Sequence, residues 1–389
     1  MLSLGMFAMG TDNFVVAGIL QGVASSLHVS VSVAGQMVSI YALSFAILAP
    51  IMAVIGGNWP RKAKLIAALA IFVLGNALTA MATDITLVLV SRAIAGLGAA
   101  MFSPTALGVA ASIVPPERKG RALSIVTAGL AGATALGAPI GTFIGGIFDW
   151  RTTLWFVAIV GLIALVGLAL MLREVPRPHR VTFVERLRPL ADSRVLLTLT
   201  TTLLAFGAML TVYTYSGLVF DRVTHGDAKL LAGLFLLWGL AATCGNLISG
   251  RLVDKFPSRV VINGILVIEI INFALMPYTS ANLVTSLIAL VVWACGGWGL
   301  MVPMQHRLVE TSPKVAPVLL AWYNSAFYSG LGLAAICGGL IILAVDPHHL
   351  GWVSAGALTV ALVMAELTQW RMTHHSKRAA TLAVVGSEA

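Results

Sequence analysis

The chain has 389 residues, of which 59% are hydrophobic and 10% are charged, and its formal net charge is +9. Soluble domains carry about 25% charged residues, so this chain has too few charges to cover a core of its size with a polar shell. The composition excludes a soluble globular protein and predicts an integral membrane protein.

Twelve apolar stretches follow one another along the chain, each close to the roughly 20 residues that a helix needs to cross a bilayer. They lack the alternation of barrel strands, so we predict an all-α protein. The first stretch is too long for a removable signal peptide and has no basic leader or small-residue cleavage site. The predicted spans are 2–24, 34–56, 65–83, 86–114, 122–147, 153–172, 196–220, 229–250, 260–280, 283–305, 317–344 and 350–370.

Lysine and arginine residues gather in alternate loops. The loops after the even-numbered spans, together with the C-terminal tail, hold twenty of the 24 basic residues, whereas the other loops hold Arg151, Arg222 and Lys229. By the positive-inside rule, both termini are expected in the cytoplasm. Because the charges are spread over six loops rather than gathered on one surface, no nucleic-acid partner is expected.

The longest polar stretch, residues 173–195, follows the sixth span and divides the spans six and six. Residues 58–62 are similar to residues 255–259 at an offset of 197, and residues 145–147 to residues 338–340 at an offset of 193. The near-equal offsets predict a parallel duplication, which is typical of transporters that alternate access to a central site. The expected units are an N-terminal six-helix bundle at 1–172, a cytoplasmic linker at 173–195, a C-terminal six-helix bundle at 196–371 and a cytoplasmic tail at 372–389.

Two ionisable residues lie deep in predicted spans. Asp12 lies about 15 Å from the cytoplasmic end of the first span, near the midplane, where an acid costs about 2.5–3.5 kcal/mol and usually serves a function. Such a carboxyl group is suited to bind and release protons; an acid that only caps or pairs inside the bundle is the alternative. Arg92, in the fourth span, needs a partner at its depth, and a brace held by backbone carbonyls is the alternative for it.

Other residues in the spans have weaker assignments. Glu269, in the middle of the ninth span, is a candidate second proton site, and Glu366, near the cytoplasmic end of the twelfth, is expected as an interfacial acid. The cysteines are expected as small buried apolar residues rather than as a disulfide or metal ligands, and they are Cys244, Cys295 and Cys337.

Aromatic, methionine and amide side chains in the spans are candidate substrate contacts, although any single one of them is more often a packing residue than a ligand contact. As a set they favour a neutral or cationic amphiphile over a phosphorylated anion, because Arg92 is the single buried cation that the predicted spans offer. The first half contributes Asn13, Tyr41, Met101 and Phe102, and the second half contributes Tyr213, Tyr215, Trp293, Trp298, Met301, Gln305, Trp322, Tyr323 and Asn324.

Four segments carry a resemblance to a known family. They are the opening GTDNFVVAGILQGVASSLHVSVSVAGQMVSIYALSFAILAP, the run from Ser91-Arg92 to Gly96-Leu-Gly98, the glycine and proline run 137–146, and Gly250-Arg251-Leu-Val-Asp254-Lys255. Together they resemble the major facilitator superfamily over essentially the whole chain. Within it, they are similar to the twelve-helix drug:proton antiporter branch, which includes bacterial exporters of sugars, purine nucleosides and chloramphenicol.

The resemblance implies two pseudo-symmetric six-helix bundles around a cavity lined by the first and fourth spans, so that Asp12 and Arg92 can interact. Protonation of Asp12 would weaken that attraction and bias the halves toward the other-facing state. It also implies a monomer in a bacterial inner membrane, a small-molecule substrate and a proton gradient as energy source, with no cofactor and no metal. The conformational motifs implied are a flexing seam at Gly137, Pro139, Gly141 and Gly145, which favours export, and an interdomain latch at Gly250, Arg251, Asp254 and Lys255.

The chain departs from the family pattern at two places. Gly57 and Asn58 stand where the second copy of the loop motif has Asp254 and Lys255, so the first copy has lost its acid. Many relatives carry a glutamate at the position of Asn13, and moving the acid by one residue to Asp12 turns it by about 100° around the helix.

Other functions remain open at this point. A proton-independent facilitator or an uptake permease of a small metabolite would share the same fold. A membrane-embedded enzyme is disfavoured because the sequence has no nucleophile elbow, no paired histidines on a helix and no glycine-rich phosphate loop. The missing nucleotide motif also argues against an ATP-driven pump. Drug, sugar and nucleoside substrates are not distinguished by these motifs.

Overall fold

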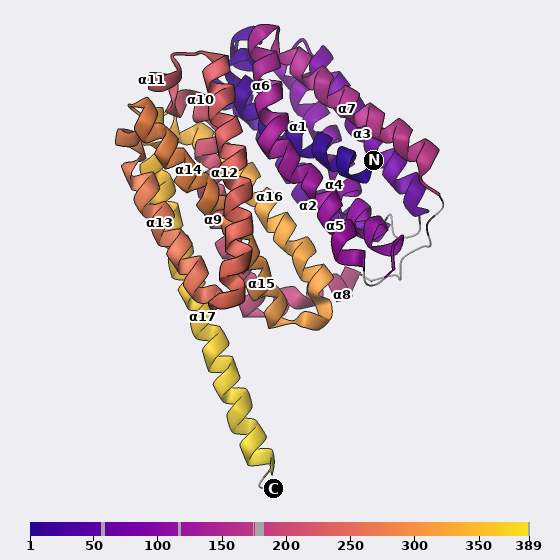
Figure 1. The fold of residues 1–389 in the computed structure, drawn as a ribbon, viewed down its shortest axis with the longest axis vertical. Coiled ribbons are helices and arrows are strands. Elements are labelled where there is room, and N and C mark those ends of the chain that lie inside the picture. The colour runs from indigo at the N-terminus through magenta and orange to yellow at the C-terminus, as the bar shows by residue number, and fades with distance from the viewer. Residues whose placement is uncertain (56–58, 116–117, 174, 176–182, 388–389) are drawn as a thin grey trace.

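The computed structural model describes residues 1–55, 59–115, 118–173, 175 and 183–387 (Figure 1). Within these residues, twelve helical stretches are long and apolar enough to cross a membrane. The all-α prediction with twelve spans is therefore confirmed.

The first half contains six spans, and the fifth of them is built from three consecutive helical segments. Helix α3 packs between α4 and α7, and α1 packs on α2, α5, α6 and α7. The segments are α1 (Leu2–Ser26), α2 (Val31–Ile55), α3 (Arg61–Met81), α4 (Ile85–Ser112), α5 (Lys119–Gly132), the π-helix η3 (Ala133–Gly137), α6 (Ala138–Ile147) and α7 (Trp150–Met171).

The second half repeats this plan after a short linker that contains α8 (Phe183–Leu187) and η4 (Arg188–Ala191). Helix α9 packs on α16 and α17, and α12 packs on α14. The segments are α9 (Ser193–Thr214), α10 (Ser216–Val219), α11 (Asp221–Thr224), α12 (Ala228–Lys255), α13 (Ser258–Thr279), α14 (Leu283–Gly299), α15 (Met301–Thr311), η5 (Pro313–Val315), α16 (Ala316–Ile341), η6 (Pro347–His349) and α17 (Leu350–Ser387).

Polar residues set where several spans begin. Asp84 accepts a hydrogen bond from the Leu87 amide at 3.0 Å, and Asn282 accepts one from the Val284 amide at 2.9 Å. Each side chain satisfies an amide that has no partner in the first turn of its helix. The apolar run can therefore start directly after the cap.

Two spans differ from the sequence prediction. The seventh was expected to continue to residue 220, but α9 ends at Thr214, where Tyr215 adopts a non-helical conformation, and the short α10 and α11 follow. The tenth span changes from α14 to α15 at Leu300. Pro303, which cannot donate a backbone hydrogen bond, lies in the first turn of α15 and explains the break.

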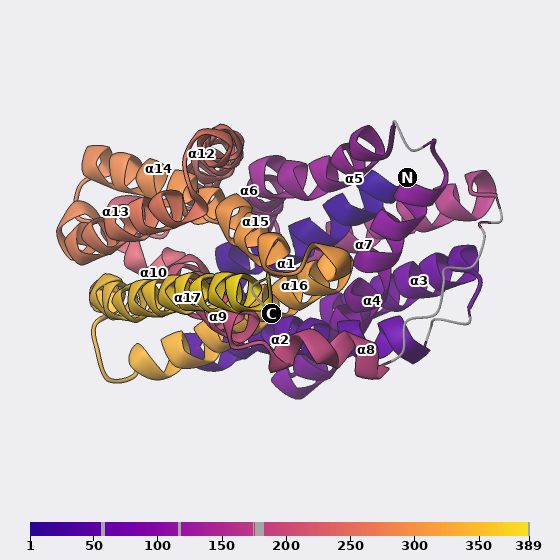
Figure 2. The ribbon, with the colours of Figure 1, turned by 90° about the horizontal axis from the view of Figure 1, so that it is seen from below.

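The two halves meet at one end and diverge toward the other, where the linker and the C-terminal helix lie (Figure 1). Seen from below, α1, α2 and α16 lie between the remaining helices of the two halves (Figure 2). At the closed end, Gln21 Nε2 donates to Gly217 O at 3.1 Å and Ser32 Oγ donates to Gly339 O at 2.7 Å. Nearer the middle, the rings of Phe45 on α2 and Tyr328 on α16 stack at 3.8 Å.

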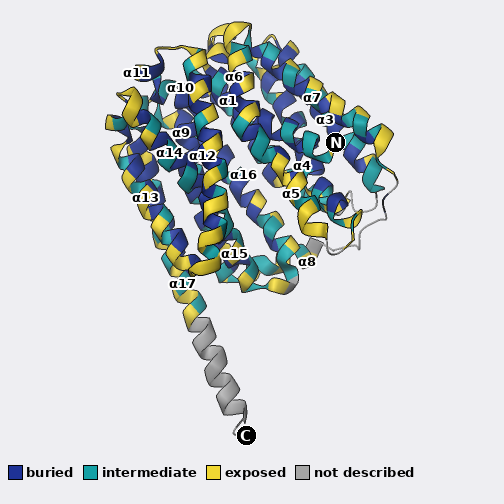
Figure 3. Cartoon of the chain, in the orientation of Figure 1, coloured by how far each residue is buried: buried dark blue, intermediate teal, exposed yellow. Residues whose placement is uncertain are grey.

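Much of the outer surface of the helices is exposed (Figure 3), and many of the exposed side chains are large and apolar. Leu162, Ile163 and Leu170 on α7 are examples of large exposed hydrophobic residues. In water such surfaces would be unfavourable, whereas in a bilayer they contact lipid chains.

Candidate functional site

A buried ion pair joins α1 to α4. Arg92 Nη1 lies 2.6 Å from Asp12 Oδ1, and the two side chains are 1% and 0% exposed. The guanidinium donates a charge-assisted hydrogen bond to the carboxylate. Asp12 lies about 15 Å along α1 from its first residue, so the pair is near the middle of the span.

Three further groups surround this pair. Asn76 Nδ2 on α3 lies 3.5 Å from Asp12 Oδ2. Arg92 Nε donates to Met37 O at 3.3 Å, and its guanidinium carbon lies 4.4 Å from the centre of the Tyr41 ring. Because these charges are kept out of water, removing one partner of such a pair typically costs about 3–5 kcal/mol.

The geometry brings together the two residues that the family resemblance implied could interact. It also agrees in part with the alternative for Arg92, a brace held by backbone carbonyls, because the Met37 carbonyl accepts a hydrogen bond from the guanidinium. Tyr41, expected as a substrate contact, lies against Arg92, and its role toward a substrate stays a prediction. Asn76 was missed, although a lone amide in the middle of the apolar third span was an available signal.

In the second half, aromatic rings gather on the side that faces α1. We define the aromatic cluster as the rings of Tyr213, Phe235, Trp238, Trp293 and Trp298, together with Phe14 of α1. Tyr213 on α9 lies 4.7 Å from Trp238 on α12, and Trp238 lies 5.8 Å from Trp293 on α14. Offset and edge-on aromatic contacts at such distances are favourable. Trp238, Phe235 and Phe14 were missed by the sequence analysis because an aromatic residue in an apolar span gives no separate signal.

The other predicted substrate contacts are dispersed. Tyr215 donates to Ala335 O at 2.7 Å, and Trp322 Nε1 donates to Arg186 O of the linker helix at 2.9 Å. Asn13 is buried, and neither end of its amide has a hydrogen-bond partner among the described residues. Of the rest, Met101, Phe102 and Tyr323 are buried, Met301 and Gln305 are half-buried, and Asn324 is exposed.

The glycine stripe of the fifth span lies against α1 of its own half. A Cβ at Gly137, Gly141 or Gly145 would overlap Thr11, Val15 or Ile19, respectively. These partners recur every four residues, as one helix face requires. The stripe was predicted to form the seam between the halves. That prediction is wrong, because the stripe packs within the first half.

The contact between the halves in this region uses other glycines. A Cβ at Gly146 would overlap Ala228 of α12, and a Cβ at Gly239 of α12 would overlap the backbone of Thr134 and Ala135 in η3. Pro139 faces this same border, where it lines a groove between α6 and α12 together with Ile140 and Leu236.

The loop motif after the eighth span lies at the open end of the molecule. Gly250 is half-buried, and Arg251, Asp254 and Lys255 are exposed at the end of α12. Gly57 and Asn58, its degraded first copy, lie outside the described residues. The role of the motif as a latch therefore stays a prediction.

Glu269 lies on α13 away from the ion pair. It is fully buried, and neither carboxylate oxygen forms a hydrogen bond of good geometry with a described residue, although the Asn272 amide is close enough to interact. A Cβ at Gly296 of α14 would overlap Glu269 Oε1, so the acid lies directly behind the helix that carries Trp293. Glu366 is partly exposed and pairs with Arg259 at 2.5 Å, as expected for an interfacial acid.

Two expectations about buried residues were wrong. Arg307, assigned to a loop, is 1% exposed in α15 and donates to Ala365 O at 3.2 Å, so Arg92 is not the single buried cation. Cys244 and Cys337 are exposed on the protein surface, and Cys295 is half-buried. Within the described part of the chain, no group of three metal-ligating side chains comes together.

Two six-span halves that meet at one end, with a buried ion pair at mid-depth in the first half, are typical of a membrane transporter. The model of the Major Facilitator Superfamily matches residues 2–335. The chain belongs to the major facilitator superfamily, and it is a multi-pass membrane protein and a secondary transporter that works by alternating access.

Individual relatives agree with this assignment. The chain is 31% identical to the uncharacterized MFS-type transporter YtbD of Bacillus subtilis, over 95% of this chain and 93% of that protein. It is 32% identical to the inner membrane transport protein YdhP of Escherichia coli K12, over 88% of each. Among solved structures, it is similar to a bacterial homologue of the human lysosomal transporter Spinster in an inward-facing, occupied conformation. That match has a TM-score of 0.73, 18% identity and 95% coverage of both chains.

Proposed function

We propose that this protein is a proton-coupled exporter of small molecules in a bacterial inner membrane. The buried pair of Asp12 and Arg92 is the observation that carries the proposal. In the inner membrane, a proton gradient is available as the energy source, and the chain needs no cofactor to use it.

The coupling step follows from the desolvation of the pair. When Asp12 binds a proton, its attraction to Arg92 weakens, and a buried cation is left without its counter-charge. Losing one partner of a buried pair typically costs about 3–5 kcal/mol. Moving a two-state equilibrium from 1:99 to 99:1 takes about 5.5 kcal/mol, so a cost of this size can drive most of a conformational change.

The conformational change is a rocking of residues 1–172 against residues 196–371, with residues 173–195 as the linker. The present contacts close the end that holds α10 and α11. The loop charges predict that this end faces away from the cytoplasm, so the structure corresponds to an inward-facing state. Glu269 is the alternative proton site. By resemblance to the family, the glycine and proline motif of the fifth span favours export over import, although its glycines pack on α1 of their own half.

The decisive experiment is uphill transport by purified protein in proteoliposomes with an imposed pH gradient and an internal pH probe. A panel of antibiotics, sugars and nucleosides supplies the substrates. We expect Asp12→Asn to abolish substrate-triggered proton movement while Glu366→Gln, which changes a partly exposed acid, retains it. Substrate flux without proton movement in the unmodified protein would instead indicate a facilitator.

A further inference from the structure

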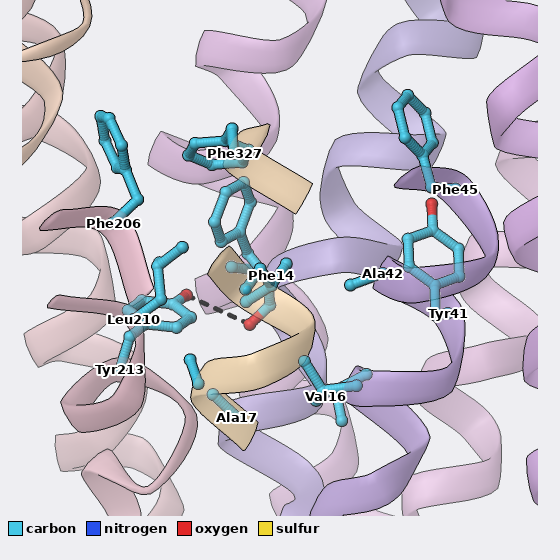
Figure 4. Close-up of a cluster of buried hydrophobic side chains, with 14 of the residues drawn as sticks. Phe14, Val16, Ala17, Tyr41, Ala42, Phe45, Phe206, Leu210, Tyr213 and Phe327 are labelled. Atoms are coloured by element: carbon cyan, nitrogen blue, oxygen red, sulfur yellow. Dashed lines mark hydrogen bonds between the residues drawn. The ribbon is translucent and has the colours of Figure 1, made fainter. Parts of the chain in front are cut away.

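Phe14 of the first half is inserted among the aromatic rings of the second half. Its ring centre lies 5.6 Å from Tyr213, 5.8 Å from Trp298 and 6.1 Å from Trp238. In the view of Figure 4 the ring of Phe14 is directed toward Phe327, and its backbone carbonyl faces the Tyr213 hydroxyl. The side chain is 1% exposed, so it is fully enclosed by these contacts.

A small cavity adjoins these rings. It has a volume of about 10 Å³, and its walls include Phe206, Trp238, Trp293, Gly297, Trp298 and Phe327. This volume holds about one water molecule, whereas pockets for small ligands usually measure about 300–1,000 Å³. Among the described residues, no charged side chain lines the cavity. A ligand can therefore enter only if a neighbouring side chain leaves, and the ligand should be uncharged.

Two hydrogen-bond donors would become available to that ligand. The Tyr213 hydroxyl donates to the backbone carbonyl of Phe14 at 3.1 Å (Figure 4). Trp238 Nε1 is buried and has no hydrogen-bond partner among the described residues. An unpaired buried donor is unfavourable, so a ligand that brings an acceptor oxygen would gain affinity here.

Phe14 and Asp12 lie on nearly opposite sides of α1. Two residues correspond to a rotation of about 200° around a helix. Asp12 contacts Arg92 within the first half, while Phe14 contacts Trp238 and Trp298 in the second. The same helix therefore connects the ion pair to the aromatic cluster.

We propose that the aromatic cluster is the substrate-binding site and that, in this state, Phe14 occupies the place of an aromatic ring of the substrate. The substrate class is uncharged, ring-bearing molecules that carry at least one hydrogen-bond acceptor oxygen. A bound substrate displaces Phe14 and shifts α1, which transmits occupancy of the site to the Asp12–Arg92 pair. This assignment rests on the proposed transport function, but the binding step requires no protons.

The first test measures equilibrium binding of methyl 2-naphthoate to the purified full-length protein by quenching of tryptophan fluorescence, without a proton gradient. Phe14→Ala removes the competing ring, and we expect it to tighten binding by about tenfold. Phe45→Ala is the matched control, because it removes another aromatic contact between the halves, the stack with Tyr328. We expect Phe45→Ala to leave the affinity unchanged.

Either of two results would overturn the role of Phe14. Equal tightening in both variants would mean that loosening the halves, rather than removing a competitor, increases affinity. Weaker binding in Phe14→Ala would mean that Phe14 is a wall of the site.

The second test fills the cavity. A Cβ at Gly297 would lie 3.3 Å from Met209 Sδ, which is flexible, so Gly297→Ala should fold normally and weaken binding modestly. Gly297→Val should abolish saturable quenching. Naphthalene-2-carboxylate, which is anionic, and the saturated ester methyl decahydro-2-naphthoate should compete at least about tenfold more weakly than the aromatic ester.

Identical quenching in all variants would show that the ester only partitions into the detergent micelle, and the binding site would be rejected. Because binding is measured without a proton gradient, this failure is distinct from a failure of proton coupling in Asp12→Asn. The two proposals can therefore stand or fall separately.

Discussion

The interior of the first half holds opposite charges, whereas the facing interior of the second half is built of aromatic rings. Asp12 and Arg92 pair at 2.6 Å, while the ring centres of Tyr213 and Trp238 lie 4.7 Å apart with their planes tilted by 45°. The second half also buries ionisable groups, but Glu269 and Arg307 are not paired with each other at salt-bridge distance. We therefore propose a division of labour, with proton chemistry in the first half and substrate recognition in the second.

The strongest test of this comparison is Arg92→Ala. It leaves the Asp12 carboxylate buried without its cation, so we expect a loss of about 3–5 kcal/mol in the free energy of unfolding. Thermal unfolding in detergent measures the effect, and Arg259→Ala, which breaks an exposed pair with Glu366, should not change stability measurably.

A double variant then isolates the pair itself. Asp12→Asn combined with Arg92→Gln removes both charges, and we expect it to be more stable than either single variant. If the stability losses of the two single variants simply add in the double variant, the two residues act independently. The first half would then have no coupled ion pair to set against the aromatic rings of the second.

The seam between the halves predicts opposite signs for two similar substitutions on α12. A methyl group at Gly239 would overlap the backbone of Thr134 and Ala135, so Gly239→Ala should destabilise the protein by about 1–3 kcal/mol. Gly233 on the same helix has nothing within 4 Å of its would-be Cβ. Gly233→Ala should therefore stabilise the helix by about 0.5–1 kcal/mol. Thermal unfolding of the two variants side by side gives the answer, and equal shifts would contradict the tight seam.

Glu269→Gln tests whether proton chemistry is confined to the first half. A buried carboxyl group without good hydrogen bonds is unfavourable, so we expect the amide to raise stability by about 1 kcal/mol. Proton-coupled flux in proteoliposomes should be retained. If flux is lost although the variant is folded, Glu269 carries a proton that the mechanism needs.

The smallest expected changes in stability distinguish two buried tyrosines, one with a hydrogen-bonded hydroxyl and one without. Tyr215→Phe removes the hydrogen bond to Ala335 O at 2.7 Å and should cost about 1 kcal/mol. The Tyr41 hydroxyl has no partner among the described residues, so Tyr41→Phe should be nearly neutral and should keep the ring beside Arg92. A large loss in Tyr41→Phe would reveal a role for its hydroxyl in the ion-pair network.

The number of spans and the ionisable residues inside them could be predicted from the sequence, because both depend on the energetic cost of polar groups in hydrocarbon. Apolar length fixed the number of spans, because each span must satisfy its own backbone in hydrocarbon. The same cost singled out Asp12, Arg92 and Glu269 as ionisable residues inside spans, and all three are fully buried. Ionisable residues are rare inside membrane spans, so these three could be recognised from the sequence alone.

Features that depend on rotation around a helix could not be predicted in this way. The glycine spacing at 137, 141 and 145 indicated a bare face but not which helix covers it, and α1 does so. Arg307 looked like a loop residue until α15 was seen to turn it toward Ala365. Phe14 and Trp238 are ordinary apolar residues in composition, and only their placement brings them together.

The π-helix of the fifth span changes which residues of that span face each neighbouring helix. A π-turn accommodates one extra residue, which shifts the phase of all later side chains by roughly 100° relative to a continuous α-helix. Helix α5 contacts α1 and α4 of its own half, whereas both η3 and α6 contact α12 of the other half as well as α1. The inserted residue near 133–137 thus lies where the span, while still packed on α1, gains its contact with the second half, and the Gly146 contact with Ala228 depends on that register.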